Sequence, residues 1–228
     1  MKPIETITKV DQVRHAILEL IFSGTLLPGQ RLVEARLAAD LGVSQATVNL
    51  ALQILHDQAI VTKILNRSTN VSRYSEREIE NLFSVRLILE PAAAAAASRR
   101  LTPAGARALE QQVDAMRRAA RESDLPRFCL ADYTFHQELY RITENPVLIQ
   151  ACQAIAAAPF AYILCDRPSA LPTDYSSLAE DHQLVIDSLR KGPEAAGKLV
   201  SELIAAWRMH SVRALESAVE TEKTYAYR

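Results

Sequence analysis

The sequence is poor in cysteine and has no long apolar run. Three cysteines, Cys129, Cys152 and Cys165, are spread over 228 residues, and an odd number at irregular spacing is not typical of a disulfide framework or of a paired-cysteine metal knuckle. We expect all three to be reduced core residues. No segment approaches the roughly 20 consecutive apolar residues of a membrane span, and the stretch Met-Lys-Pro-Ile-Glu-Thr at the start lacks the apolar core of a signal peptide. These absences predict a cytoplasmic protein without a membrane partner.

The chain also lacks a strong charge of either sign. The formal net charge is −1, yet residues 1–74 hold eight basic and six acidic side chains, a net of +2. A mild basic bias is consistent with a DNA partner, because affinity for DNA comes largely from neutralising phosphates. The length suits a small domain followed by one of roughly 150 residues. We therefore expect two domains, 1–74 and 75–228.

A stretch near the N-terminus predicts two short helices joined by a glycine turn. Apolar residues mark the buried side of the first helix, Gly42 supplies the turn, and Ser44 is a good N-cap for the second helix. The apolar residues recur at helical spacing and are Leu37, Ala38, Leu41, Val48, Leu52 and Leu55. The pattern predicts a helix-turn-helix, although two core helices with a polar solvent face would give the same spacing.

The flanking segments add a third helix and a hairpin. Upstream, Val13, Ile17, Leu18 and Ile21 predict an amphipathic helix that ends at Ser23-Gly24. Downstream, residues 59–65 have the branched apolar content of a strand, residues 66–70 read as a turn, and residues 71–73 can return as the partner strand. Three helices and a small β-hairpin make a winged helix.

These residues resemble the GntR family of bacterial transcription regulators. The resemblance rests on the leader from Ile21 to Leu32 and on the Leu-Ala-x-x-Leu-Gly-Val-Ser core, and it runs through about residue 73. It implies double-stranded DNA as partner, read by a homodimer at an inverted repeat. Gln45 and Asn49 stand where members usually carry arginine, and amides can pair with adenine. The expected DNA-binding residues are Arg31, Ser44, Gln45, Thr47, Asn49 and Arg67.

Helix signals dominate the second half. Ser75 followed by Glu78 makes a capping box. Helices are then expected from residue 79 through the alanine run 92–97, from 102 to 116, 125 to 140, 146 to 164, 176 to 190, and 193 to about 219. No strand candidate is present in this half. The predicted fold is mainly α: an N-terminal winged helix-turn-helix and a C-terminal all-α antiparallel helical bundle.

This half resembles the FCD domain of the FadR branch of the same family. The motifs that carry the resemblance are Val-Arg-Leu-Ile-Leu-Glu at 85–90, Asp-x-x-Phe-His at 132–136, Glu-Asn-Pro-Val-Leu at 144–148, and Asp-His-Gln at 181–183. The resemblance implies a domain that dimerises and that receives a small organic acid or related metabolite. Polar residues expected near its cavity are Arg86, Tyr133, Tyr140 and Trp207, with Glu90 as an alternative ion-pair partner for Arg86 one turn away.

The resemblance also implies a divalent metal in the bundle. Asp132 and His136 are four residues apart, so they share a helix face, and His182 matches a third ligand. Carboxylate with imidazole suits Zn²⁺, Ni²⁺ or Mn²⁺. Leu203 stands where the fourth ligand is expected, and His210 is the nearest histidine after it. A three-ligand metal site and a buried, metal-free hydrogen-bonded cluster both fit these residues.

Two other functions remain open from the sequence. Cys129, Asp132 and His136 share one helix face and could support metal-assisted or thiol-assisted hydrolysis, but Cys129 and His136 lie about 10 Å apart along the helix axis. A dimeric scaffold that has lost DNA binding is the other alternative. We expect a DNA-binding transcription regulator that acts as a repressor and has no catalytic residues.

Overall fold

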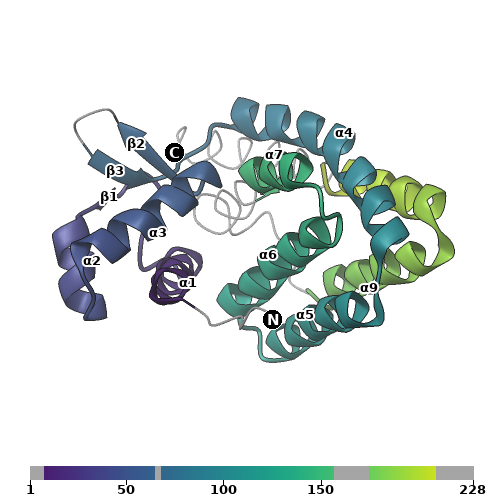
Figure 1. Ribbon diagram of the computed structural model, residues 1–228, viewed down its shortest axis with the longest axis horizontal. Coiled ribbons are helices and arrows are strands. Elements are labelled where there is room, and N and C mark those ends of the chain that lie inside the picture. Colours follow the sequence, from purple (N-terminus) through teal and green to yellow (C-terminus); the bar gives the residue numbers. More distant parts are fainter. Residues whose placement is uncertain (1–7, 65–67, 157–174, 209–228) are drawn as a thin grey trace, which may run out of the picture.

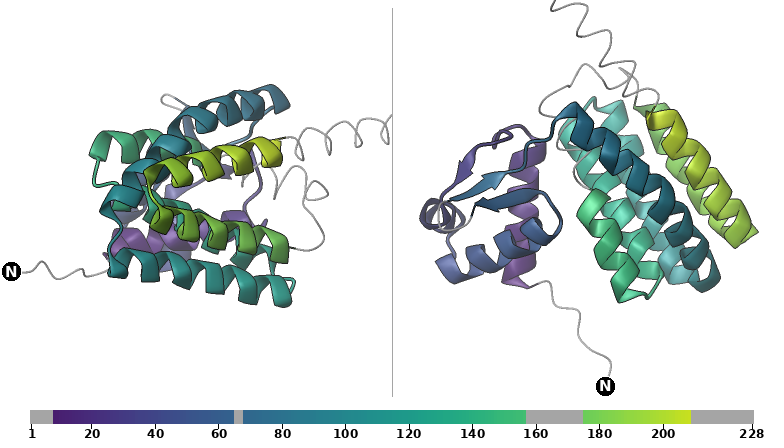
Figure 2. Two further views of the ribbon diagram at one scale, coloured as in Figure 1. Left: turned by 90° about the vertical axis from the view of Figure 1, so that its right-hand side faces the viewer. Right: turned by 90° about the horizontal axis from the view of Figure 1, so that it is seen from above.

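The computed structural model describes residues 8–64, 68–156 and 175–208 of the chain. The sheet and its three helices form one body, and the later helices stack beside it with α6 next to α1 (Figure 1). Viewed from above, the long helices of the second body run side by side (Figure 2). The predicted fold class is confirmed.

The helix-turn-helix forms from the residues that predict it. Helix α1 covers Lys9–Phe22, α2 covers Glu34–Leu41 and α3 covers Gln45–Asp57. Gly42 lies in the left-handed region with φ 64°, and the Ser44 side chain accepts a hydrogen bond from the Thr47 amide. Val48, Leu52 and Leu55 are completely buried. The caps and apolar spacing therefore fix both the turn and the face of α3 that points inward.

The wing differs from the predicted hairpin. It is a three-stranded antiparallel sheet in the order β1-β3-β2, made of Arg31–Leu32, Ser68–Val71 and Val61–Ile64. The return strand was expected at residues 71–73 and lies at 68–71 instead, so the predicted turn 66–70 is too long; residues 66 and 67 lie outside the described residues. Gly29 has φ +78°, and its amide donates to the Val71 carbonyl. That turn places Arg31 opposite Asn70 and creates the extra strand.

The second body is helical throughout its described part. Its helices are α4 at Glu76–Arg100, α5 at Pro103–Arg121, α6 at Leu125–Ile142, α7 at Pro146–Ala156, α9 at Ser176–Lys191, and a helix over 193–208. Ser75 and Glu78 form the expected capping box at the start of α4. The predicted continuations to 164 and 219 lie outside the described residues.

The alanine run is a close-packing surface. Ala93, Ala94 and Ala97 of α4 are fully buried. A side chain added at Gly197 would meet the Pro91 carbonyl at 3.2 Å, so the helix over 193–208 approaches the α4 backbone closely at this point. Small side chains on both helices allow this approach, which places the end of the later helix near α9.

Candidate DNA-binding face and buried polar cluster

Helix α3 carries an uncharged row of amide side chains on its outer face. Gln45, Asn49 and Gln53 are exposed and recur every four residues, so they lie in one row along the helix. The Asn49 Nδ2 atom donates to Glu34 Oε1 of α2 at 2.9 Å. Lys63 of β2 donates to Gln53 Oε1 at 2.8 Å. Strand β2 of the wing and helix α2 therefore each hold one amide side chain of this row in place.

The other sequence-predicted DNA residues fall around this face. Ser44 is exposed and engaged in capping α3, with its Oγ 2.8 Å from Thr47 Oγ1. Arg31 is exposed on β1, opposite Asn70. Arg67 lies outside the described residues. Sequence reasoning missed Glu34 and Lys63, because they lie 15 and 10 residues from Asn49 and Gln53 along the chain and no local pattern links them.

A second polar cluster lies inside the helical body, where Asp132 and His136 of α6 meet His182 of α9. All three are buried. His182 Nε2 is 2.9 Å from Asp132 Oδ1, and His136 Nε2 is 3.4 Å from the same oxygen. One potential ligand atom from each residue lies within 4.8 Å of the others. The structure thus brings together the three predicted metal ligands.

Hydrogen bonding shows why this cluster fits a cation. His182 Nδ1 donates to the Leu178 carbonyl at 2.7 Å, so in neutral His182 the Nε2 atom has only a lone pair to direct at Asp132. Neither Asp132 Oδ1 nor His182 Nε2 makes a well-aligned hydrogen bond with another described residue. Two acceptors at 2.9 Å repel each other. A proton on His182 or a metal ion between the two atoms removes this repulsion.

The charges in the cluster shift its proton equilibria accordingly. Burial alone would lower the pKa of His182, but the negative charge of Asp132 raises it. Burial alone would raise the pKa of Asp132, but the positive charge of His182 holds it well below its usual range. A carboxylate with imidazoles is a donor set suited to Zn²⁺, Ni²⁺ or Mn²⁺, and a ligand histidine usually donates its other nitrogen to a carbonyl. The residues fit the implied metal.

The predicted effector residues separate into two groups. Tyr140 is completely buried, and its hydroxyl lies 3.4 Å from His136 Nδ1. The Trp207 ring stacks on His182 with ring centroids 5.8 Å apart, and its Nε1 donates to Asp181. Tyr133 does not join them. Its hydroxyl donates to Gln58 of the winged helix at 2.8 Å.

Arg86 has the ion-pair partner that the sequence suggested. Its Nε atom is 2.5 Å from Glu90 Oε1, and a second nitrogen donates to Glu90 Oε2 at 3.2 Å. Both side chains are buried, and Glu90 Oε2 lies 3.9 Å from His136 Nδ1. The pair therefore borders the cluster of Asp132, His136 and His182 with its charges largely balanced.

Burial makes the Cys152 thiol a poor nucleophile. Cys129 and Cys152 are buried and reduced, and burial raises the pKa of Cys152 to about 12. A thiol with so high a pKa supplies little thiolate at neutral pH. Cys165 lies outside the described residues.

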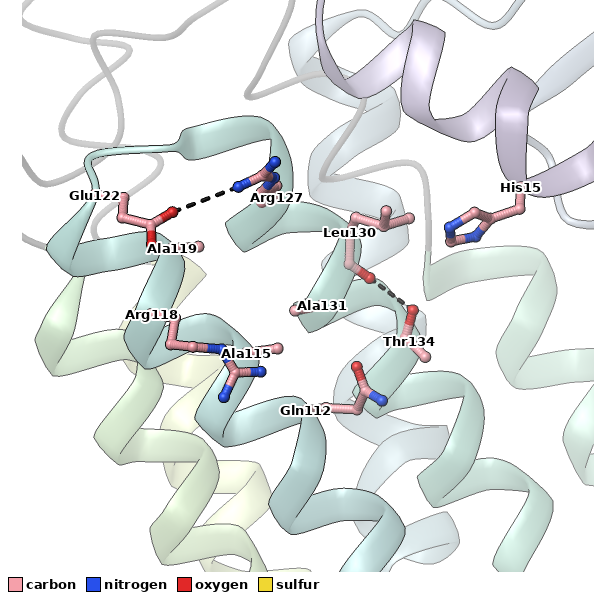
Figure 3. Close-up of a pocket in the computed structure, with 10 residues that line it drawn as sticks. All are labelled: His15, Gln112, Ala115, Arg118, Ala119, Glu122, Arg127, Leu130, Ala131 and Thr134. Carbon is pink, nitrogen blue, oxygen red and sulfur yellow. Dashed lines mark hydrogen bonds and ion pairs between the residues drawn. The ribbon is translucent and has the colours of Figure 1, made fainter.

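A hollow of about 410 Å³ opens between α1, α5 and α6 (Figure 3). His15 of α1 borders it on one side, and Arg118 and Arg127 border it on the other. Arg127 already pairs with Glu122 and Asp124. None of the residues expected to contact an effector lines this hollow, so it is separate from the buried polar cluster.

The arrangement defines a class of protein: a winged helix that presents an amide-bearing helix, joined to an α-helical body with a buried carboxylate and imidazole cluster. Residues 81–206 match the FCD domain, and residues 9–71 match the bacterial regulatory proteins of the gntR family. The chain belongs to the GntR family of transcription regulators that carry an FCD domain.

Two known relatives match three quarters or more of the chain. The "Probable D-xylose utilization operon transcriptional repressor" of Paenarthrobacter nicotinovorans is 29% identical over 223 residues, which are 96% of this chain and 97% of that protein. The gluconate operon transcriptional repressor of Bacillus licheniformis is 23% identical and covers 75% of this chain and 71% of its own length. The structure of E. coli McbR/YncC has a TM-score of 0.70 at 20% identity, with 93% and 100% coverage, which shows the shared fold.

Within the part of the chain that the structure describes, no helix is both long and apolar enough to cross a bilayer. The relatives named above are described as transcriptional repressors.

Proposed function

We propose that this chain is a homodimeric repressor that binds an inverted-repeat operator through α3 and releases it in response to a small organic acid. Residues 1–74 form the DNA-binding domain, and residues 75–228 form the domain for effector binding and dimerisation. The observation that carries the proposal is the exposed amide row of α3, Gln45, Asn49 and Gln53, on the helix that enters the major groove in winged helices.

The operator is tested by selection. The full-length protein is incubated at low salt with random and genomic duplex fragments, and bound fragments are sequenced over several rounds. We expect an inverted repeat, because a two-fold protein reads a two-fold site. Recovery of no enriched sequence overturns the repressor function and leaves the scaffold alternative. Light scattering during chromatography measures the mass, and a monomer in the presence and absence of DNA overturns the dimer.

The effector class follows from the helical body and from the relatives. Arg86, Tyr140 and Trp207 border the cluster and are the residues we assign to the carboxylate of the effector, which would compete with Glu90 for Arg86. Tyr133 is assigned to the contact with the winged helix instead. Two relatives are described as repressors of D-xylose utilization and gluconate operons, so sugar-derived acids are the first compounds to test. A thermal-shift screen of aldonic, uronic and dicarboxylic acids should give one class that raises the melting temperature and releases DNA.

A divalent metal belongs to the same proposal. Asp132, His136 and His182 would hold it, and the ion would supply positive charge that attracts the carboxylate of the effector. Trp207 shields His182 from one side by stacking, and Leu178 fixes the orientation of its ring. The enzyme alternative, which rests on Cys129, Asp132 and His136, has no comparable support, because Cys129 and His136 lie about 10 Å apart along the helix axis. The relatives are also described as transcription regulators.

A further inference from the structure

The outer face of α3 carries a second row of residues beside the amides. Ala46 and Leu50 are exposed and lie four residues apart, each directly after an amide of the first row. Leu50 exposes 56% of its surface. The inner side of the same helix is filled by other residues, since Val48, Ala51, Leu52 and Leu55 are fully buried. Leu50 is therefore not needed by the core of the winged helix.

The composition of α3 limits what its outer face can bind. The helix contains no lysine and no arginine, and its ionisable residues, His56 and Asp57, lie at its C-terminal end. Guanine is read mainly by bidentate arginine or lysine in the major groove. Helix α3 itself offers no such side chain. The face instead combines amide groups with an apolar strip of Ala46 and Leu50.

The major groove has one apolar group to match that strip. Among the base edges exposed there, only thymine presents a methyl group, at C5. Asn49 complements it, because its Nδ2 atom gives one of its two hydrogens to Glu34 and its Oδ1 atom can accept a hydrogen bond. The N6 amine of adenine is a donor in the same groove. Apolar and amide rows side by side thus suit A·T base pairs.

We infer that Ala46 and Leu50 contact the 5-methyl groups of thymines in the operator half-site, which makes Leu50 a specificity-determining residue. This inference rests on the proposed function. The exposed Leu50 side chain would then contact the methyl group of thymine. Helix α3 would recognise thymine and not guanine, because it has no arginine or lysine. Glu34 holds Asn49 beside it through the 2.9 Å hydrogen bond, so the two rows act on neighbouring bases.

The test removes single methyl groups from the DNA. Each thymine of the selected half-site is replaced in turn by deoxyuridine, which keeps base pairing and loses only the 5-methyl group. Binding of the full-length protein is measured by fluorescence anisotropy. We expect one or two positions at which the replacement weakens binding about three- to fivefold, the effect of losing one buried methyl-sized apolar contact.

The variant Leu50→Ala tests whether Leu50 is the side chain that contacts the thymine methyl group. We expect this variant to bind the thymine and deoxyuridine versions of one such position equally, because the partner of the methyl group is gone. Leu184→Ala is the matched control, since Leu184 of α9 is a leucine with similar exposure, 50%, outside the winged helix. It should retain the wild-type ratio. Arg31→Ala is a second control, expected to weaken binding to both versions by the same factor.

Each remaining outcome decides the inference. If a half-site is selected but no deoxyuridine replacement changes the affinity, or if Leu50→Ala keeps the wild-type ratio, Leu50 does not read thymine and the proposed function still stands. Selection of a half-site that contains no thymine would likewise overturn the inference and leave the proposed function standing. If no sequence is selected at all, the proposed function fails and the inference fails with it. Equal melting temperatures of Leu50→Ala and wild type exclude a folding defect.

Discussion

The hydroxyl of Tyr133 donates a hydrogen bond to the side-chain oxygen of Gln58, and both residues are buried where the two bodies of the molecule meet. Gln58 ends the recognition helix α3. Tyr133 directly follows Asp132 on α6, and its ring lies 6.1 Å from that of Phe22 of α1. The C-terminal end of α3 is therefore bonded to α6, the helix that carries two residues of the buried polar cluster.

Loss of the hydrogen bond between Tyr133 and Gln58 should lower the stability of the protein. Tyr133→Phe leaves the buried Gln58 amide without its hydroxyl partner, so we expect the free energy of unfolding to fall by about 1 to 2 kcal/mol. Gln58→Leu should destabilise as well, and the double variant should lose less than the sum of the two. Denaturant unfolding of all four proteins measures this difference. Strict additivity would show that the two groups do not interact in solution.

Much of the fold could be predicted because its signals are local. The caps at Ser44 and Ser75 and the apolar spacing of α3 each lie within one or two helical turns, and the structure confirms them. Strand β1 could not be found this way. It has two residues, Arg31 and Leu32, and it exists because they pair with Asn70 and Thr69 far along the chain. No local pattern encodes such a pairing.

The candidate site divides in the same manner. Asp132 with His136, and Arg86 with Glu90, are pairs four residues apart on one helix, so the sequence places each pair on a common face. His182 comes from a different helix, and only the family resemblance indicated its position. The direction of Tyr133 could not be predicted, because it depends on how the winged helix docks on α6. The exposure of Leu50 likewise depends on the packing of the other α3 residues.

The buried ion pair should be far more sensitive to one substitution than to two. Arg86→Met leaves the Glu90 carboxylate buried and unpaired beside His136, and we expect a loss of about 3 to 5 kcal/mol in the free energy of unfolding. Arg86→Met with Glu90→Leu removes both charges and should recover much of that loss. Thermal and denaturant unfolding compare the variants. A double variant less stable than the single one would contradict this balance of charges.

The capping box at the start of α4 should make stability depend on pH. Hydrogen bonds from Ser75 lower the pKa of Glu78 below its ordinary value of 4.5. A lowered pKa means that the stabilisation is complete above the ordinary value and is lost as the pH falls through the lowered one. We expect Glu78→Gln to be less stable than wild type at pH 7, with the difference shrinking in acid. Ser75→Ala should cost about 1 kcal/mol at pH 7. A difference that grows in acid would contradict the assignment.

DNA affinity and DNA preference should respond to different residues. Arg31→Ala should weaken binding to all sequences and reduce the salt dependence, as expected for a side chain that contacts phosphate. Asn49→Ala should mainly change the preference at one base position. We expect the same result for Arg67→Ala as for Arg31→Ala, although Arg67 lies outside the described residues. Anisotropy titrations at several salt concentrations, with matched and mismatched duplexes, separate the two effects. Identical changes in both variants would contradict this division.

The metal content of the purified protein tests whether the buried polar cluster binds an ion. If Asp132, His136 and His182 bind an ion, elemental analysis should find about one divalent metal per chain, and His136→Ala should remove it and lower the melting temperature.

The position of the missing fourth ligand is then tested by two substitutions one turn apart. Leu203→His restores the ligand expected from the family pattern and should slow metal loss to a chelator. Trp207→His is the matched comparison, because Trp207 already stacks on His182. Tighter binding in Trp207→His but not in Leu203→His would place the ligand position one turn later than the resemblance implies. A metal that survives His182→Ala but is lost in His210→Ala would overturn the three-residue site, because the ion would then depend on a histidine outside that site. His210 itself lies outside the described residues.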